Sequence, residues 1–405
     1  MLKRLKKIVA GISALVIMAT ATACGSDTKW AVQYDDYEAR AGIFLFYQMS
    51  AYYDAISIIT EEDSEFDTTD TKALKSATVE DTPIVEWIQN DTTEKVKIYL
   101  EVLKEFDELG LSLTEDELST IDTITDTYWE YYSEYYTTNG IGEESFRDIN
   151  TYSYKRDAVF NYYYAEGGVE EVDEQELKDY YEKNNARVKY ICLNSTDSDG
   201  NFLDTEMETM AEDFVTRANN GEDFDTLIDE YEQYKEDLSA EQEAEAEAEA
   251  ESETESADGT IESTSANSSN STDDTTIGDS LSESEEVSTD TETEEEEDPY
   301  PNEYVVTKSE DETSGSPTYK VNQEIFGHSN YGDAFLVEED SAYYVVVRYD
   351  IWERDDLWTD DTKATILSTL YSDKFDEKML DAVDDDLVTL NDKAYKRYNP
   401  LDMEF

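Results

Sequence analysis

The feature that most limits how this chain can fold is an acidic segment in its middle, at residues 236–299. It consists almost entirely of Glu, Asp, Ser, Thr and Ala, with a Glu-Ala repeat and a run of glutamates at Glu294–Glu297. This composition offers almost no apolar surface to bury, so folding cannot offset the loss of chain entropy. Repulsion between like charges also opposes a helix over the Glu-Ala repeat. We therefore predict a disordered, extended insert that interrupts the folded parts of the chain.

Acidic residues far outnumber basic ones in the chain of 405 residues, whose formal charge is -72. Such a charge repels phosphate backbones and excludes nucleic acid as a partner. It equally opposes electrostatic docking on anionic lipid. The acidic insert lacks the combined spacing of glycine and ligands that a calcium loop has, so solvated filler is favoured over the alternative of a low-affinity binder of cations, and we predict no metal site and no cofactor.

The N-terminus has the three regions of a bacterial export signal. Four basic residues open it, an apolar run follows over Ile8–Ala19, and small residues precede Cys24. The run is shorter than the roughly 20 residues of a membrane-spanning helix. Residues 21–24 resemble the lipobox of bacterial lipoproteins, although Ala21 stands where Leu is usual. We predict a signal peptide at 1–23 and lipid on Cys24, which anchors the protein to the outer face of the cell membrane.

The alternatives are an ordinary signal peptide with an incidental cysteine, and a short anchor that is never cleaved. Cleavage would remove four positive charges and leave a formal charge of -76. Acylation of Cys24 would leave Cys192 without a disulfide partner, because the chain has only two cysteines.

Ahead of the insert, residues 30–182 show apolar side chains at helical spacing. Gly110 follows one periodic stretch at the position of a helix C-terminal cap. The residues Thr114–Glu117 have the pattern of a capping box that opens a helix. We predict an entirely helical region, with helices over Ile43–Ile59, 96–106, 114–139 and 145–164, and a further helix that Asp173 caps.

The periodicity then changes to that of strands on both sides of the insert. Residues 187–193 and 342–348 have the β-branched and aromatic composition of strands, and 304–307 is a shorter one. Helical patterns occupy the stretches between and after them, at 205–219, from Gly221 onward, 322–326 and 359–382. The fold class that we predict is α+β.

The two longer strands, with Gly221–Phe224 and Leu227 between them, resemble a parvulin-type peptidyl-prolyl isomerase domain. The segment Val172–Glu182 looks like the linker helix of extracytoplasmic foldases of the SurA and PrsA type. The resemblance implies a helical chaperone-like domain at 24–182, a parvulin-like α+β domain at 183–235 and 300–355, the acidic insert at 236–299, and a C-terminal helical segment at 356–405.

The residues that should catalyse isomerisation in this family are changed. Its active members have histidines in the first and last strands, where this chain has Tyr190 and Tyr344, and the family's Gly-Gly-x-Leu-Gly stretch has no counterpart. The barrier to isomerisation, about 20 kcal/mol, is lowered by desolvating and twisting the imide bond. The sole histidine, His328, lies in a Gly-His-Ser-Asn turn, and we expect ordinary surface there. We predict weak or absent isomerase activity and name no catalytic residue.

A groove that binds extended peptide can remain in a protein whose catalytic residues have been lost. We predict a chaperone that binds unfolded exported polypeptides, with a candidate peptide groove formed by Tyr190, Phe224, Phe326 and Tyr344. The aromatic stretches 52–53, 128–136 and 162–164 are a second candidate surface, since tyrosines suit promiscuous binding. The alternative for each of these tyrosines is that it packs inside a helical bundle.

A solute-binding lipoprotein of a transporter is the rival function. That class has repeated strand–helix units in two α/β lobes, whereas the first part of this chain has helical spacing. Adjacent strands 187–193 and 342–348 in one small sheet would favour the foldase, and two lobes around a cleft would exclude it. One histidine and two cysteines are too few for a zinc site or a histidine-based nucleophile site.

Deleting residues 240–296 should leave the melting temperature of the folded module nearly unchanged, because closing a longer flexible loop adds little free energy. Differential scanning calorimetry of the intact and shortened chains tests this expectation. A large loss of melting temperature would contradict the idea of an inert insert.

Overall fold

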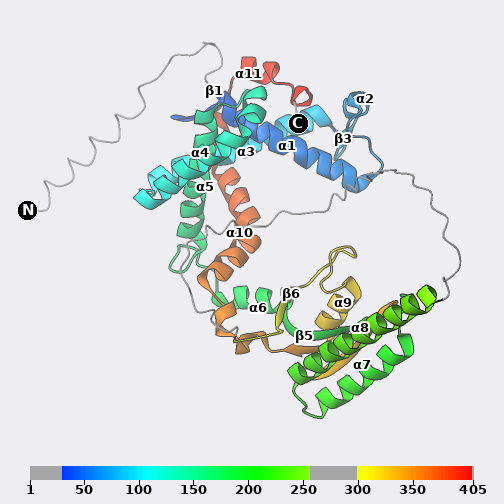
Figure 1. The fold of residues 1–405 in the computed structure, drawn as a ribbon. Coiled ribbons are helices and arrows are strands. Elements are labelled where there is room, and N and C mark those ends of the chain that lie inside the picture. Colours follow the sequence, from blue (N-terminus) through cyan, green and yellow to red (C-terminus); the bar gives the residue numbers. More distant parts are fainter. Residues whose placement is uncertain (1–29, 256–298, 404–405) are drawn as a thin grey trace, which may run out of the picture. The chain divides into compact units, whose positions relative to one another are not determined.

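The computed structural model describes residues 30–255 and 299–403 (Figure 1). The chain divides into two compact units, Met1–Leu177 with Asp360–Phe405, and Lys178–Thr359. Cys24 and residues 256–298 of the insert lie outside the described residues. Over the described residues, no helix combines the length and the apolarity that a membrane crossing requires.

The first unit is mainly a bundle of long helices whose last member comes from the other end of the chain. The capping box at Thr114 is confirmed: its side chain accepts a hydrogen bond from the Glu117 backbone, and the Glu117 carboxylate accepts one from the Thr114 backbone. Gly110 follows its helix with a positive φ of 68°, as a C-terminal cap requires. The long helices are α1 (Ala41–Glu62), α3 (Ile84–Glu108), α4 (Glu115–Thr138), α5 (Glu143–Tyr164) and α10 (Asp360–Ala382).

The helix α10 packs on the bundle through Phe375, whose ring lies 5.6 Å from that of Phe160 on α5. An ion pair at 2.8 Å between Arg156 and Asp376 joins the same two helices. Shorter helices in this unit are α2 (Thr71–Leu74) and α11 (Asp392–Arg397), and α6 (Glu174–Asn184) leads out of it. Short 3-10 turns occupy Ile351–Glu353, Asp355–Leu357, Asp385–Leu387 and Pro400–Asp402.

The prediction of an entirely helical region over residues 30–182 is wrong at its start and at residues 78–83, where the structure has strands. The strands β1 (Trp30–Tyr34) and β2 (Tyr37–Arg40) form a hairpin, with Asp35 at a φ of 52° in the turn. The strand β9 (Val388–Leu390) completes a three-stranded sheet in the order β2-β1-β9. A second, two-stranded ladder joins β3 (Thr78–Val79) to β4 (Thr82–Pro83). Local periodicity missed the first sheet because β9, which stabilises the hairpin, lies near the far end of the chain.

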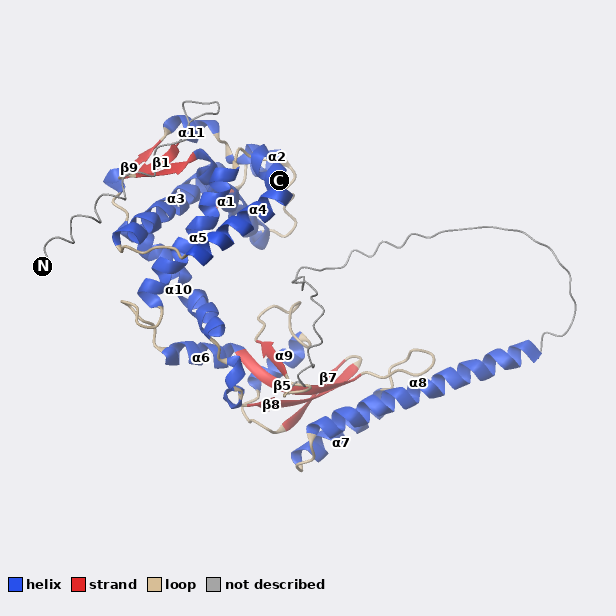
Figure 2. Ribbon diagram, turned by 60° about the vertical axis from the view of Figure 1, so that its left-hand side comes forward, coloured by secondary structure: helices blue, strands red, loops and turns tan. Residues whose placement is uncertain are grey.

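The second unit contains a four-stranded antiparallel sheet in the order β6-β5-β8-β7 (Figure 2). Its strands are β5 (Asn185–Leu193), β6 (Tyr304–Thr307), β7 (Ala334–Glu339) and β8 (Ala342–Tyr349). The expected adjacency of the strands on either side of the insert is confirmed, since β5 pairs with β8 from Arg187↔Tyr349 to Leu193↔Tyr343. The helices are α7 (Asp204–Asn219), α8 (Phe224–Glu255) and α9 (Tyr319–Gly327). Together with the helical first unit, this sheet confirms the α+β class.

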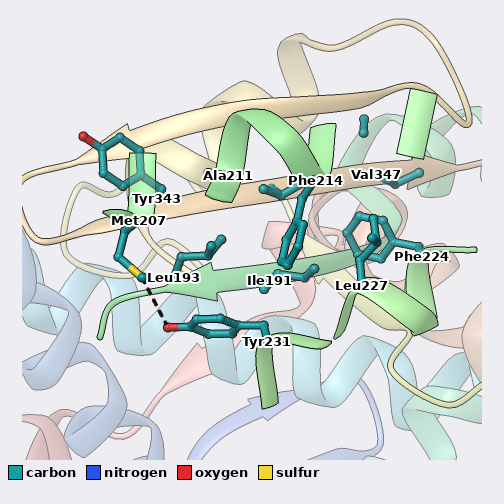
Figure 3. Packing of buried hydrophobic residues seen from close by; sticks show 12 residues of the cluster. Ile191, Leu193, Met207, Ala211, Phe214, Phe224, Leu227, Tyr231, Tyr343 and Val347 are labelled. Carbon is teal, nitrogen blue, oxygen red and sulfur yellow. Dashed lines mark hydrogen bonds between the residues drawn. The ribbon is translucent and has the colours of Figure 1, made fainter. Parts of the chain in front are cut away.

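One face of this sheet forms the core of the second unit with α7 and α8. Tyr231 of α8 is buried there, and its hydroxyl accepts a hydrogen bond of 2.8 Å from the Asn194 backbone and lies 4.0 Å from the Met207 sulfur (Figure 3). The polar tip of this large side chain is therefore satisfied inside an apolar core. The other buried residues of the core are Ile191, Leu193, Ala211, Phe214, Phe224, Leu227, Ala334, Tyr343, Val345 and Val347.

The predicted disorder of the insert is wrong for residues 236–255, because α8 continues through them to Glu255. Ala, Glu and Gln are among the strongest helix formers. The first turns of α8 are already held by the core, so each further residue extends an existing helix and no new nucleus is needed. These two effects outweigh the repulsion between the glutamates. The side chain of Gln242 also donates a hydrogen bond of 2.8 Å to the Thr196 backbone.

The helix that leads into the insert and the chain that returns from it are both attached to β5 by buried cations. The Arg187 side chain is 9% exposed and donates two hydrogen bonds, of 2.6 and 2.7 Å, to the carboxylate of Glu303, where the chain returns from the insert. Lys189 pairs at 2.6 Å with Asp225, in the first turn of α8. The Asp225 carboxylate also accepts a hydrogen bond of 3.1 Å from Asn302. These contacts hold the entry helix and the returning chain on one strand.

Replacing Arg187 with Met should lower the free energy of unfolding by about 3 kcal/mol, because the buried Glu303 carboxylate would lose both hydrogen bonds from Arg187 and keep only the longer ion pair with Arg354, at 3.6 Å. Urea denaturation of the full chain, followed by circular dichroism, measures the loss. The double variant Arg187→Met with Glu303→Leu should recover much of it, since no buried charge is left unpaired: Arg354 keeps its ion pair with Asp356, and Glu353 is exposed.

The matched control is Lys235→Met, which breaks an exposed pair with Glu232 in the same unit. It should change stability by no more than about 1 kcal/mol. Equal losses for Arg187→Met and Lys235→Met would refute the attachment of the returning chain by a buried ion pair.

Candidate functional site

The face of the sheet opposite the α7–α8 core carries the residues that the sequence singled out. Successive side chains of a strand point to opposite faces, so Val188, Tyr190 and Cys192 of β5 share one face, away from Ile191 and Leu193. In β8 the same alternation sets Tyr344 and Val346 on that face. The helix α9 covers part of it through Val321 and Ile325.

Three tyrosines from three strands meet on this face. The ring of Tyr190 lies 5.0 Å from that of Tyr304 on β6 and 6.2 Å from that of Tyr344 on β8. Cys192 stands directly opposite Tyr344 in the ladder. Tyr304 is 48% exposed, whereas Tyr344 is buried and Tyr190 is half-buried. We call Tyr190, Tyr304 and Tyr344, with Cys192, the tyrosine face.

The four residues of the predicted groove do not lie together. Tyr190, Phe326 and Tyr344 belong to one cluster on the tyrosine face. Phe224 is 5% exposed and lies in the core on the other side of the sheet, beside Leu227 (Figure 3). The prediction is therefore wrong for Phe224. The sequence around Phe224 indicates that its side chain is buried in the first turn of α8. It does not indicate which face of the sheet that side chain packs against.

The chemistry available on this face is that of neutral phenols and one thiol. Burial, followed by the hydrogen bond with Cys192, raises the pKa of Tyr344, and burial raises the pKa of Tyr190. Both hydroxyls therefore stay protonated at neutral pH, where they can donate and accept hydrogen bonds. Cys192 is half-buried and is a free thiol. These four side chains can bind polar backbone groups and apolar side chains, and the nearby carboxylate of Glu339 contributes to the raised pKa of Tyr344.

The sole histidine lies against the same cluster. Its ring stacks on Phe335 of β7 at 4.2 Å, and Phe335 packs on the cluster of the tyrosine face. His328 ends α9 and is half-buried, and its expected lack of a catalytic role stays a prediction. Arg348 secures this end of α9 by donating hydrogen bonds to the carbonyls of Ile325 and His328, at 3.2 and 2.9 Å. Cations commonly stabilise a helix C-terminus in this way.

Sequence reasoning missed Tyr304, Cys192 and Phe335 as members of this surface. The period-two alternation that joins Tyr190 to Cys192 was visible in the strand 187–193. Tyr304 could be associated with them only once β6 was paired with β5, and Phe335 only once β7 was paired with β8. Across residues 30–255 and 299–403, no group of three or more His, Cys, Asp or Glu side chains is placed to hold a metal ion.

Comparison with known proteins identifies distant structural neighbours. A foldase protein PrsA from Streptococcus pneumoniae shares 15% sequence identity at a TM-score of 0.31, over 80% of this chain and 95% of that chain. A foldase protein (PrsA) from Lactococcus lactis shares 13% identity at a TM-score of 0.29, over 92% of this chain and 98% of that chain. No protein-family model matches the chain, and no curated protein matches it. Because both TM-scores are this low, neither the function nor the site residues of these neighbours can be assigned to this chain.

We expect truncation of a side chain to alanine to cost more stability on the core face of the sheet than on the tyrosine face. Phe224→Ala should lower the free energy of unfolding by about 3–5 kcal/mol, because it opens a cavity in the core. Tyr304→Ala should lower it by less than about 1.5 kcal/mol, because nearly half of that side chain is already in water. Urea denaturation of both variants gives the comparison. A Tyr304→Ala loss as large as that of Phe224→Ala would mean that the tyrosine face is core rather than surface.

Proposed function

We propose that the protein is a lipid-anchored extracytoplasmic chaperone that binds unfolded exported polypeptides and has weak or absent peptidyl-prolyl isomerase activity. The observation that carries this proposal is the contact between Tyr190 and Tyr344 on a partly exposed sheet face. These are the two positions at which the resembling isomerases have histidine.

The composition of the tyrosine face supports binding more than catalysis. Aromatic rings provide large apolar contact areas, and phenol hydroxyls satisfy polar backbone groups without demanding one sequence. Catalysis of isomerisation needs polar groups that stabilise a twisted imide, and both positions are changed together. Since burial raises the pKa of Tyr190, this phenol supplies no charge at neutral pH.

The N-terminal features support the location. A basic start, a short apolar run and small residues before Cys24 have the order of a lipoprotein export signal. Stable anchoring requires two or more acyl chains, which a diacylated cysteine supplies. The mature charge of -76 would keep the body of the protein from adhering to anionic lipid, so the lipid itself must hold it there.

The transporter-linked solute-binding protein is not favoured. That class needs two α/β lobes, each built on a largely parallel sheet. In the described part of this chain, the pairings of all three sheets are antiparallel. One unit is a helical bundle and the other has a single four-stranded sheet.

A refolding assay with the mature chain, made soluble by Cys24→Ser, tests the proposal. Light scattering of a denatured, aggregation-prone protein should fall when the chain is added, because the tyrosine face holds unfolded segments. The proline-limited refolding of a reporter protein should accelerate little or not at all. The reverse pattern, rapid isomerisation without suppression of aggregation, would refute the proposal.

Matched variants locate the effect. Tyr190→Ser with Tyr304→Ser should reduce the suppression of aggregation by at least about twofold, since the loss of even one aromatic contact weakens binding measurably. Tyr234→Ser is the control, because Tyr234 is also half-buried but packs with the core on the other face of the sheet. If Tyr234→Ser reduced the suppression of aggregation as much as the double variant, the tyrosine face would not be the surface that binds unfolded polypeptide.

A further inference from the structure

Tyrosines also crowd an outward side of α4 in the first unit. Tyr131 is 76% exposed, and Tyr128 and Tyr132, which are stacked at 6.1 Å, are each half exposed. The hydroxyl of Tyr135 lies 3.0 Å from that of Tyr53, a half-exposed residue of α1. We call these five residues the α4 tyrosine patch.

Tyr135 also packs against the buried cluster of Leu45, Met49 and Ile141, but the exposed Tyr128, Tyr131 and Tyr132 lie outside the packing surface of α4. That surface is formed by other aromatics of the same helix, because Trp129 and Tyr136 contact the ring of Phe146 on α5 at 5.7 and 4.8 Å. Ile121 and Thr125 complete the buried side. A group of exposed aromatic side chains on a protein surface commonly marks a site of interaction.

A row of carboxylates borders the patch. Asp126, Glu130 and Glu134 are spaced four residues apart on α4, and all three are exposed. Residues three or four apart are neighbours on a helix, so Tyr131 lies beside both Tyr128 and Glu134. Like charges at this spacing destabilise a helix by about 0.2–0.5 kcal/mol per pair. The row thus weakens the helix that carries it.

No cation offsets this row. The helix α4 contains no Lys or Arg. Asp122, one turn earlier, is paired with Arg147 of α5. Among the described residues, no ion pair or hydrogen bond engages the carboxylates of Asp126, Glu130 and Glu134. The patch therefore combines exposed rings with uncompensated negative charge.

We infer that the α4 tyrosine patch selects cationic unfolded segments, in which lysine or arginine accompanies apolar side chains. This inference rests on the proposed chaperone function and names its preferred substrate class. The rings attract cations through their faces, and the adjacent carboxylates add a longer-range attraction that accelerates encounter. A second copy of this chain is a poor occupant, because its charge of -72 would be repelled.

The test compares two labelled, unstructured peptides with the same aromatic and aliphatic residues, one bearing lysines and the other glutamates at the same positions. Fluorescence anisotropy with the soluble mature chain gives both affinities. The lysine peptide should bind at least about tenfold more tightly at about 0.05 M salt, and this advantage should shrink at about 0.5 M salt as screening increases.

Two sets of variants separate the contribution of the tyrosine rings to peptide binding from that of the carboxylates. Asp126→Asn with Glu130→Gln and Glu134→Gln should remove most of the preference for the lysine peptide. Tyr128→Ser with Tyr131→Ser and Tyr132→Ser should weaken the binding of the lysine peptide. The matched charge control is Glu208→Gln with Glu212→Gln and Asp229→Asn, three exposed carboxylates of the second unit. Circular dichroism confirms that each variant is folded.

Equal affinity for the two peptides, or an equal loss in the control variant, would overturn the inference. If the chain still suppressed aggregation in that case, the proposed chaperone function would stand and only the charge preference would be wrong. If neither peptide bound and aggregation were not suppressed, both the inference and the proposed function would fail.

Discussion

The antiparallel pairing of β5 with β8 is the interaction on which the second unit depends. These strands lie on opposite sides of the acidic insert, and their register runs without interruption from Arg187↔Tyr349 to Leu193↔Tyr343. Because side chains alternate along a strand, this register assigns every residue to the α7–α8 core or to the tyrosine face. A slip of one residue would exchange the two sets. The candidate site is thus a consequence of the same pairing that builds the core.

The long insert is compatible with this pairing because the helix before it and the chain after it are both attached to β5. Arg187 and Lys189 stand on the core side of β5 and hold Glu303 and Asp225. A buried ion pair adds little net stability compared with an apolar pair, but it tolerates few alternative partners. In this unit it defines where the returning chain must lie.

Both candidate binding surfaces use tyrosine where a hydrophobic surface could use leucine. Tyr190, Tyr304 and Tyr344 meet on the sheet, and Tyr128, Tyr131 and Tyr132 line α4. A phenol ring offers apolar area while its hydroxyl remains compatible with water. A highly acidic body keeps such a protein soluble through mutual repulsion. Under the proposed function, the exposed aromatic surface would bind polypeptide and the large negative charge would oppose self-association.

Much of the local structure followed from the sequence alone. The capping box at Thr114, the long helices with their cap at Gly110, and the strands beside the insert were predicted from spacing, because their determinants lie within a few residues of one another. The replacement of both family histidines by Tyr190 and Tyr344 was equally visible in the sequence.

Tertiary structure decided the rest. It paired β9 with β1, continued α8 to Glu255, and set Phe224 on the face opposite Tyr190. Each of these outcomes depends on contacts between segments far apart in the chain. A local pattern specifies which side chains are apolar and at what period, but the partner that buries them, and the face on which it does so, exist only once distant segments have come together.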